Sequence, residues 1–172
     1  MKKFIVLLKG VNVGGKNLLP MKTFVSLLES KNYQNVSSYI QSGNIVLQCS
    51  ADPANDLKDI ITEHYGFTPE VFTLNDTELS TAITNNPYSE HKGNLVHFYF
   101  CHHDIELNHS QLDKFIAPSE EYYIQGNVFY LYAPNGIGRS KLVTNIESCL
   151  GQKATGRNVN TVNKISAIAK SI

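Results

Sequence analysis

Four segments of the chain combine glycine, asparagine, serine and basic residues in a pattern that suits the binding of an anion. They are residues 10–17 (GVNVGGKN), 41–44 (QSGN), 134–141 (PNGIGRSK) and 157–163 (RNVNTVN), and none contains an acid or a histidine. The two arginines of the chain, Arg139 and Arg157, both fall within them. Glycine permits positive φ and exposes backbone N–H groups, and a guanidinium matches phosphate or carboxylate oxygens. Ordinary tight turns with solvated charges are the alternative interpretation.

If these segments form a site, its charged and polar groups can be named from the sequence. We expect lysine and arginine to carry the charge contacts and the short polar side chains to orient the ligand. The predicted ligand-binding residues are Asn12, Lys16, Ser42, Asn44, Arg139, Lys141, Arg157 and Asn160.

The first segment also fits the phosphate-binding loop pattern G-x-x-x-x-G-K over residues 10–16. Such a loop continues with Ser or Thr for Mg²⁺, whereas position 17 is Asn. In that class of loop a helix follows directly, whereas here the helix pattern starts only near Pro20. These departures argue against a nucleotide triphosphatase of that class.

Other chemically capable residues form no arrangement that indicates catalysis. Residues 101–104 read CHHD, but neighbouring side chains of a strand end point to opposite faces, so we expect an exposed strand end and no metal site. Ser140 precedes a helix pattern and is expected to be its N-cap. The catalytic residues are unknown, and neither a metal nor a cofactor is predicted.

The elements that would position these segments occur in the same order twice. The first half predicts strands at 4–8, 37–41, 45–49 and 71–74, with helices at 20–28, 52–66 and 76–83. The second half predicts strands at 95–101, 121–124, 128–132 and 153–157, with helices at 112–116, 142–151 and 162–169. Hydrophobic spacing and turn residues carry these assignments, including Asp52 and Asp76 as helix caps.

A short sequence match supports an internal duplication. Residues 39–47 read YIQSGNIVL and residues 123–131 read YIQGNVFYL, each in the hairpin of its own half. The order βαββαβ is that of the ferredoxin-like unit. We therefore predict an α+β fold of two tandem ferredoxin-like units, each with antiparallel strands, helices on one face and a trailing helix. The predicted domains are residues 1–86 and 94–172, packed as one globule, joined by a linker at 85–94.

Composition limits the classes of function. Lys+Arg and Asp+Glu are equal at 15 each, and this zero net charge does not support binding to nucleic acid. Nucleic-acid binding would require a local basic patch. The apolar run at the N-terminus ends at Lys9 and predicts a buried strand instead of a signal peptide, and we expect no membrane partner. Three separated cysteines without a CxxC predict free thiols and a cytoplasmic location. The oligomeric state is not predicted.

The four segments together resemble the domain of unknown function 1697 family of bacterial proteins. Members look like LRGINVGGKN, TYIQSGN, PNGIGRSKL and TRNWNTV, and the matching stretches occur here in the same order. Lys9, Val11, Gly156 and Val159 stand where members carry Arg, Ile, Thr and Trp. The resemblance implies paired ferredoxin-like units and no known activity.

Three functions follow as hypotheses. The first is a binding module for a small anionic or phosphorylated ligand, such as a nucleotide, a phosphometabolite or an RNA end, held where the unlike loops of the two halves meet. The second is an enzyme of unassigned reaction that uses groups outside the four segments, drawn from His97, His102, Asp104 and the tyrosines. The third is a protein-interaction domain, which would expose an apolar patch.

Overall fold

The chain forms two compact units in the computed structural model, which describes residues 1–172. Unit 1 contains residues 1–81 together with residues 163–172, and unit 2 contains residues 82–162. The prediction of two consecutive domains did not include this grouping of the C-terminal residues with the first unit.

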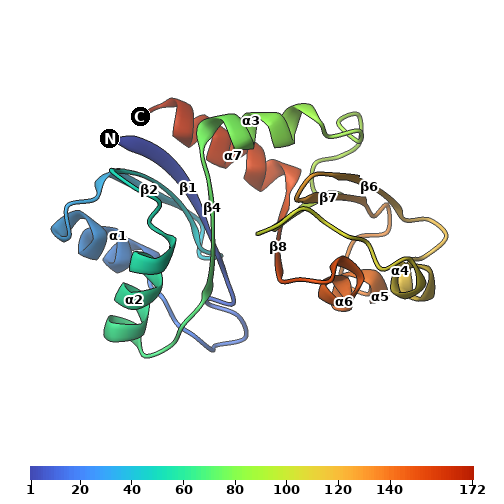
Figure 1. Cartoon of the computed structure of the whole chain (residues 1–172), viewed down its shortest axis with the longest axis horizontal. Helices are drawn as coiled ribbons and strands as arrows, with labels where there is room; N and C mark the ends of the chain where they lie inside the picture. Colours follow the sequence, from blue (N-terminus) through green and yellow to red (C-terminus); the bar gives the residue numbers. More distant parts are fainter. The chain divides into compact units, whose positions relative to one another are not determined.

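Unit 1 is built around a four-stranded antiparallel sheet (Figure 1). The spatial order of its strands is β2-β3-β1-β4, which is the ferredoxin-like order. Its elements are β1 (Lys2–Lys9), α1 (Met21–Ser30), β2 (Gln34–Tyr39), β3 (Asn44–Cys49), α2 (Ala54–Tyr65), β4 (Glu70–Leu74) and the first part of α3 (Asp76–Thr84).

Unit 2 repeats this topology with the strand order β6-β7-β5-β8. The two sheets therefore confirm the predicted α+β fold of tandem ferredoxin-like units. The elements of the rest of the chain are β5 (Val96–Cys101), α4 (His109–Phe115), β6 (Glu121–Gln125), β7 (Val128–Tyr132), α5 (Lys141–Thr144), α6 (Ile146–Leu150), β8 (Ala154–Asn158) and α7 (Val159–Lys170).

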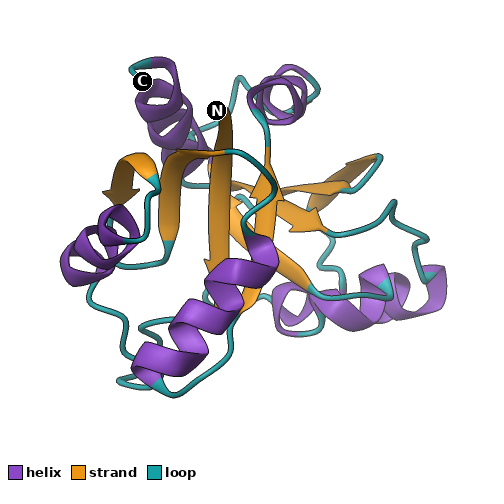
Figure 2. Cartoon of the chain, turned by 60° about the vertical axis from the view of Figure 1, so that its left-hand side comes forward, coloured by secondary structure: helices purple, strands orange, loops and turns teal.

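Two helices of unit 1, α1 and α2, pack against one face of its sheet (Figure 2). In unit 1, Phe24 and Leu28 of α1 and Leu57 of α2 form one core with alternate residues of the strands, such as Val6 and Leu47. The core of unit 2 is formed in the same way from Leu112, Leu142 and Leu150 against β5 and β7. The alternation of apolar residues along the strands thus directs one face of each sheet to its helices.

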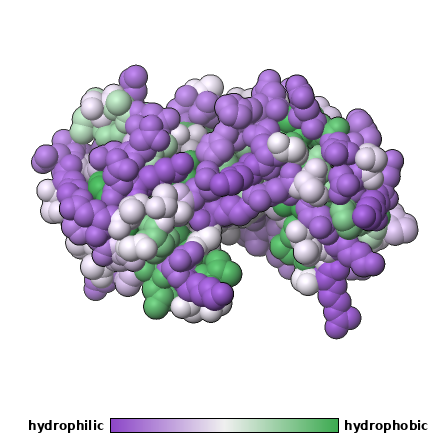
Figure 3. All heavy atoms as spheres, turned by 60° about the horizontal axis from the view of Figure 1, so that its bottom comes forward, coloured by the Kyte–Doolittle hydropathy of each residue, from purple (hydrophilic) through white to green (hydrophobic).

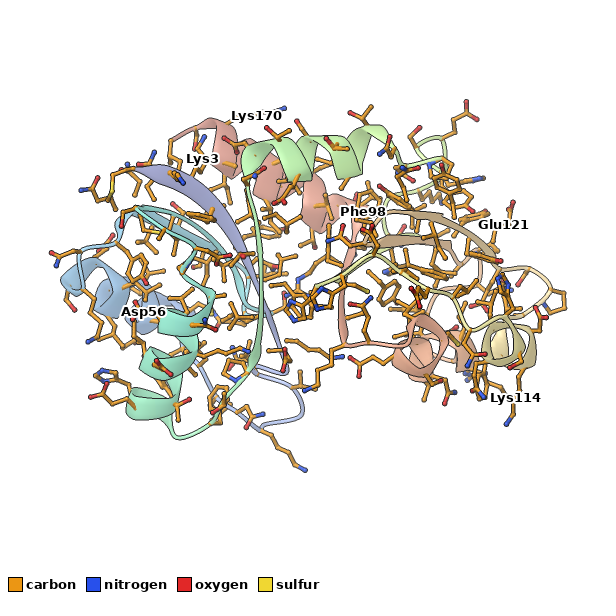
Figure 4. The ribbon with its side chains drawn as sticks, viewed as in Figure 1. Lys3, Asp56, Phe98, Lys114, Glu121 and Lys170 are labelled. Atoms are coloured by element: carbon orange, nitrogen blue, oxygen red, sulfur yellow. The ribbon has the colours of Figure 1, made fainter.

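The opposite face of each sheet is also buried. Ile5, Leu7 and Val46 of unit 1 are almost fully inaccessible to solvent, as are Phe98 and Tyr130 of unit 2 (Figure 4 labels Phe98). Central strands buried on both faces require continuous apolar sequence, which explains why β1 and β5 lack the usual alternation of polar and apolar residues.

Helix ends explain most differences from the predicted bounds. Gly66 and Gly151 end α2 and α6 in the left-handed conformation, as predicted. The cap of α3 is Asn75 and not Asp76, because Asn75 and Glu78 exchange side-chain to backbone hydrogen bonds of 2.8 Å each. The helix predicted at 142–151 is divided at Asn145, where φ is −113°.

One close approach in unit 2 requires a glycine. Gly156 of β8 lies opposite Tyr99 of β5, and a Cβ on Gly156 would lie 2.6 Å from the Tyr99 ring. The ring thus covers the position that a side chain at residue 156 would occupy. Tyr99 is itself buried, so it has little room to move.

Replacing Gly156 by alanine is expected to destabilise the protein by ~1–3 kcal/mol, because the buried ring must shift to make room. Chemical denaturation followed by circular dichroism measures this change. Gly138→Ala is the matched control, since nothing lies within 4 Å of a Cβ at Gly138 and its φ is not positive. Equal denaturation midpoints for the two variants would contradict this account of the packing.

Candidate functional site

The loop after β1 and the hairpin turn before β3 lie together in unit 1 because these two strands are neighbours. β1 pairs antiparallel with β3, so the end of one strand meets the start of the other. The backbone N–H of Leu8 donates to the carbonyl of Gly43 at 2.8 Å. A Cβ on Gly43 would lie 2.8 Å from atoms of both Leu8 and Val11, so only glycine fits this turn.

Asn12 joins the two segments through its side chain. Its Nδ2 donates to the Gln41 carbonyl at 2.7 Å and to the Leu19 carbonyl at 2.9 Å, while its Oδ1 accepts from the Leu19 N–H at 2.7 Å. Gln41 Oε1 in turn accepts from the N–H of Met21, the first residue of α1, at 3.4 Å. Two segments that are separated by about thirty residues in the chain thus form one hydrogen-bonded unit, which we call the loop pair (residues 10–19 and 40–44).

The backbone of the first loop has an unusual density of left-handed residues. φ is positive at Gly10, Asn12, Gly14, Gly15 and Asn17. Glycine and asparagine are the residues that tolerate this conformation, which is the physical reason for the composition of the segment. The exposed N–H groups of Gly14 and Gly15 make no hydrogen bond within the chain, so they are open to a ligand.

Lys16 is the candidate cation of the loop pair. It is exposed, and its backbone closes the loop through a 3.0 Å hydrogen bond to the Val13 carbonyl. The first acid along the chain is Glu29. Lys9, at the end of β1, lies directly opposite Glu70 of β4 and is therefore less suited to hold an anion.

Exposed aliphatic side chains belong to the same two segments as Lys16. Five large hydrophobic residues of the chain are exposed, and three of them, Val13, Leu18 and Ile40, belong to the loop pair. Ile40 also has φ of 51°, which is rare for a β-branched residue. Figure 3 shows apolar atoms among hydrophilic ones on the surface of this unit. A ligand at the loop pair would therefore meet apolar groups as well as a charge.

The other two predicted residues of unit 1 lie in the hairpin. Asn44 is buried, and its Nδ2 donates to Ser42 Oγ at 2.9 Å and to the Tyr39 carbonyl at 3.1 Å. The structure thus brings Ser42 and Asn44 of the hairpin together with Asn12 and Lys16 of the first loop in the loop pair. Gln41, which the sequence analysis did not select, is part of the same network.

Arg139 and Lys141 are exposed on the loop that precedes α5 in unit 2. Ser140 between them is the N-cap of α5, as predicted, because its Oγ accepts from the Val143 N–H at 3.2 Å. The same hydroxyl donates to a Glu120 carboxylate oxygen at 2.6 Å. A carboxylate therefore lies close to this basic loop and weakens the attraction of the loop for an anion. The contact with Glu120 could not be predicted from the sequence.

The remaining predicted residues lie at the end of unit 2. Arg157 of β8 is only 8% exposed, and its Nη1 donates to Thr155 Oγ1 at 2.7 Å and to the Gly156 carbonyl at 2.8 Å. Burial lowers the pKa of its guanidinium to about 10. Asn160 lies in the first turn of α7, where its carboxamide packs so closely on Gly93 that a Cβ there would overlap it.

The segment after β5 occupies the place in unit 2 that the first loop occupies in unit 1. Cys101 is buried and is joined to the hairpin turn by Asn127, whose Nδ2 donates to the Cys101 carbonyl at 2.9 Å. His102, His103 and Asp104 are exposed. No group of three or more His, Cys, Asp and Glu side chains in the chain could hold a metal ion.

His97 of β5 contains a buried nitrogen without a partner. The residue is 7% exposed, and its Nε2 makes no hydrogen bond. Burial lowers the pKa of the imidazole, and a hydrogen bond to the Asn94 backbone opposes this shift only in part. The ring is therefore neutral in the folded protein near neutral pH.

The chain matches the family model "Protein of unknown function (DUF1697)" over residues 1–130. It belongs to this family. A solved structure, that of the conserved bacterial protein SP0830 from Streptococcus pneumoniae, matches with a TM-score of 0.68 and 21% sequence identity, covering 98% of each chain. At this identity the match shows the fold alone. No curated protein matches the sequence.

Two further findings concern the chain as a whole. The three cysteines, Cys49, Cys101 and Cys149, are buried free thiols. None of the helices has the length and apolar character needed to span a membrane.

Asn12→Gly should loosen the loop pair, because glycine keeps the positive φ but removes three side-chain hydrogen bonds. We expect a loss of ~1–3 kcal/mol in the free energy of unfolding. The amide of Leu19 should also exchange faster with solvent, as seen by NMR. Asn17→Gly is the control, since Asn17 has a similar φ and its side chain makes one bond, to the Gly10 carbonyl at 3.0 Å. Equal protection of Leu19 in both variants would contradict the proposed role of Asn12.

His97 is expected to lower the free energy of unfolding when the pH falls below neutrality. The unfolded chain binds a proton at His97 near pH 6.5, and the folded protein binds it only at lower pH, so the free energy of unfolding decreases as the pH falls below about 6.5. His97→Leu removes this contribution, so its stability should vary less with pH over that range. Urea denaturation between pH 5 and pH 8 tests this, and an unchanged pH profile would show that His97 does not titrate in this way.

Proposed function

We propose that this protein binds a small anionic or phosphorylated ligand, such as a nucleotide or phosphometabolite, at the glycine- and asparagine-rich loop pair of unit 1. The observation that carries the proposal is the fixing of the loop by Asn12, in a segment where exposed Gly14 and Gly15, whose N–H groups have no partner in the chain, directly precede the exposed Lys16. Backbone N–H groups with a nearby cation are the usual means of holding a phosphate oxygen.

The order of the first loop favours the loop pair as a binding site, because a flexible turn would have to be fixed when the ligand binds. The loop is fixed at both ends. The Asn12 N–H donates to the Asn17 carbonyl at 3.0 Å, and Asn17 Nδ2 donates to the Gly10 carbonyl. A loop that is already ordered loses little conformational entropy when a ligand binds. The loop of unit 2 with Arg139 and Lys141 is a weaker candidate because of the adjacent Glu120 carboxylate.

The proposal is tested by ligand-induced stabilisation of the whole chain. Inorganic phosphate, AMP, ATP and a sugar phosphate are added separately, and the free energy of unfolding is measured by denaturation. At a concentration of about ten times Kd, a ligand should stabilise the folded state by ~1.4 kcal/mol. Lys16→Gln, which lowers affinity about tenfold, should reduce this to ~0.4 kcal/mol.

Lys22→Gln is the matched control, because Lys22 is equally exposed but lies in α1 outside the loop pair. The proposal fails if none of the four compounds stabilises the protein. It also fails if Lys16→Gln and Lys22→Gln respond alike, since the anion would then be bound elsewhere or only by general charge.

A further inference from the structure

A second site is indicated at the opposite end of the same sheet. Lys2 and Cys49 pair at that end of the β1–β3 ladder, whereas Leu7 and Asn44 pair beside the loop pair. A pocket of about 410 Å³ opens there, between the end of α1 and the start of α2. This volume is in the range of pockets that bind small molecules. The lining residues that matter are Lys31, Tyr33, Cys49, Asp52 and Asp56.

The floor of this pocket is neutral. Tyr33 and Cys49 are 9% and 8% exposed, and burial is the main cause that raises the pKa of each. The Tyr33 hydroxyl donates to the Asp56 carboxylate, and the Cys49 thiol donates to the Ala51 carbonyl at 3.0 Å. Both side chains therefore stay protonated at neutral pH and supply surface without charge.

The rim carries charges of both signs that do not pair with each other. Lys31 is exposed and makes no ion pair within 4.0 Å, although Asp52 and Asp56 line the same pocket. Asp52 is held in place by Thr73 at 3.0 Å and by the Ala54 N–H at 3.0 Å. Asp56, which Figure 4 labels in the first turn of α2, uses one oxygen for Tyr33 and leaves the other open. A separated ammonium and carboxylate in one pocket can each take the opposite charge of one ligand.

The corresponding place in unit 2 carries different side-chain contacts. There the loop after β7 is tied to the segment before β6 by Ser140 to Glu120 at 2.6 Å and by Asn135 to Ser119 at 3.3 Å. In unit 1 the Tyr33 hydroxyl and the Asp56 carboxylate join the equivalent segments. The polar groups at this place thus differ between the two copies.

We propose that this pocket binds a small zwitterion with an ammonium and a carboxylate, of the amino-acid class. The ligand ammonium donates to the open oxygen of Asp56, with Asp52 nearby, and its carboxylate accepts from Lys31. The carbon chain between them lies over the neutral floor of Tyr33 and Cys49. This site shares no residue with the loop pair and stands independently of the anion site proposed there.

The test compares three probes of one chain length, 4-aminobutyrate, butylamine and butyrate, by titration of the whole protein followed by NMR or calorimetry. Because each charge-assisted contact changes affinity about tenfold or more, 4-aminobutyrate should bind at least about tenfold more tightly than either single-charge analogue. Glycine has a shorter distance between its ammonium and carboxylate groups, so comparing its affinity with that of 4-aminobutyrate shows which distance the pocket prefers.

Asp56→Asn should remove the preference for 4-aminobutyrate over butyrate while keeping an acceptor for Tyr33. Lys31→Gln, at an exposed position, should remove the preference for 4-aminobutyrate over butylamine. This second variant tests the proposal even if Asp56→Asn is unstable. Asp59→Asn in α2 and Lys22→Gln in α1 are controls with the same changes of charge at exposed positions outside the pocket. The proposal is overturned if 4-aminobutyrate binds no better than the analogues, or if each pocket variant matches its control.

Discussion

Strand β1 is buried on both faces, and the organisation of unit 1 depends on this constraint. Ile5, Val6, Leu7 and Leu8 are all essentially inaccessible to solvent, and β1 pairs with β3 on one side and with β4 on the other. Because β1 is paired with β3, both segments of the loop pair emerge at the end where these two strands meet. The loop pair is therefore a direct result of strand order. In unit 2 the same constraint on β5 places the CHHD segment and the turn at Gly126 together.

The two units show how one scaffold carries different chemistry at equivalent ends. Unit 1 presents a cationic loop rich in glycine and asparagine where unit 2 presents histidines and an aspartate. At the other end, unit 1 has a pocket lined by charges of both signs, and unit 2 has a basic loop whose Ser140 donates a hydrogen bond to Glu120. The backbone tolerates this divergence because the side chains that fix the register lie in the strands and not in the loops.

The fold could be predicted from local signals because those signals agree with the tertiary structure. The hairpins at YIQSGN and YIQGN, the terminal glycines Gly66 and Gly151, and the apolar spacing of the helices all correspond to observed elements. Features that depend on partners distant in sequence could not be predicted. Arg157 was predicted as a ligand-binding residue from its type, whereas the alternation of β8 buries its side chain together with Thr155, and a strand pattern of five residues does not reveal that side. Gly156 lies opposite Tyr99, and only this cross-strand ring explains why no side chain fits there.

The grouping of residues 163–172 with unit 1 has a consequence for the order of events during synthesis. These residues include Ile165 and Ala169, both buried, and they follow all of unit 2 in the sequence. Unit 2 is continuous in sequence, so all of its residues are synthesised before residues 163–172. Unit 1 begins first but lacks these ten residues until unit 2 has been synthesised, so it is the later of the two to reach its complete native state on the nascent chain.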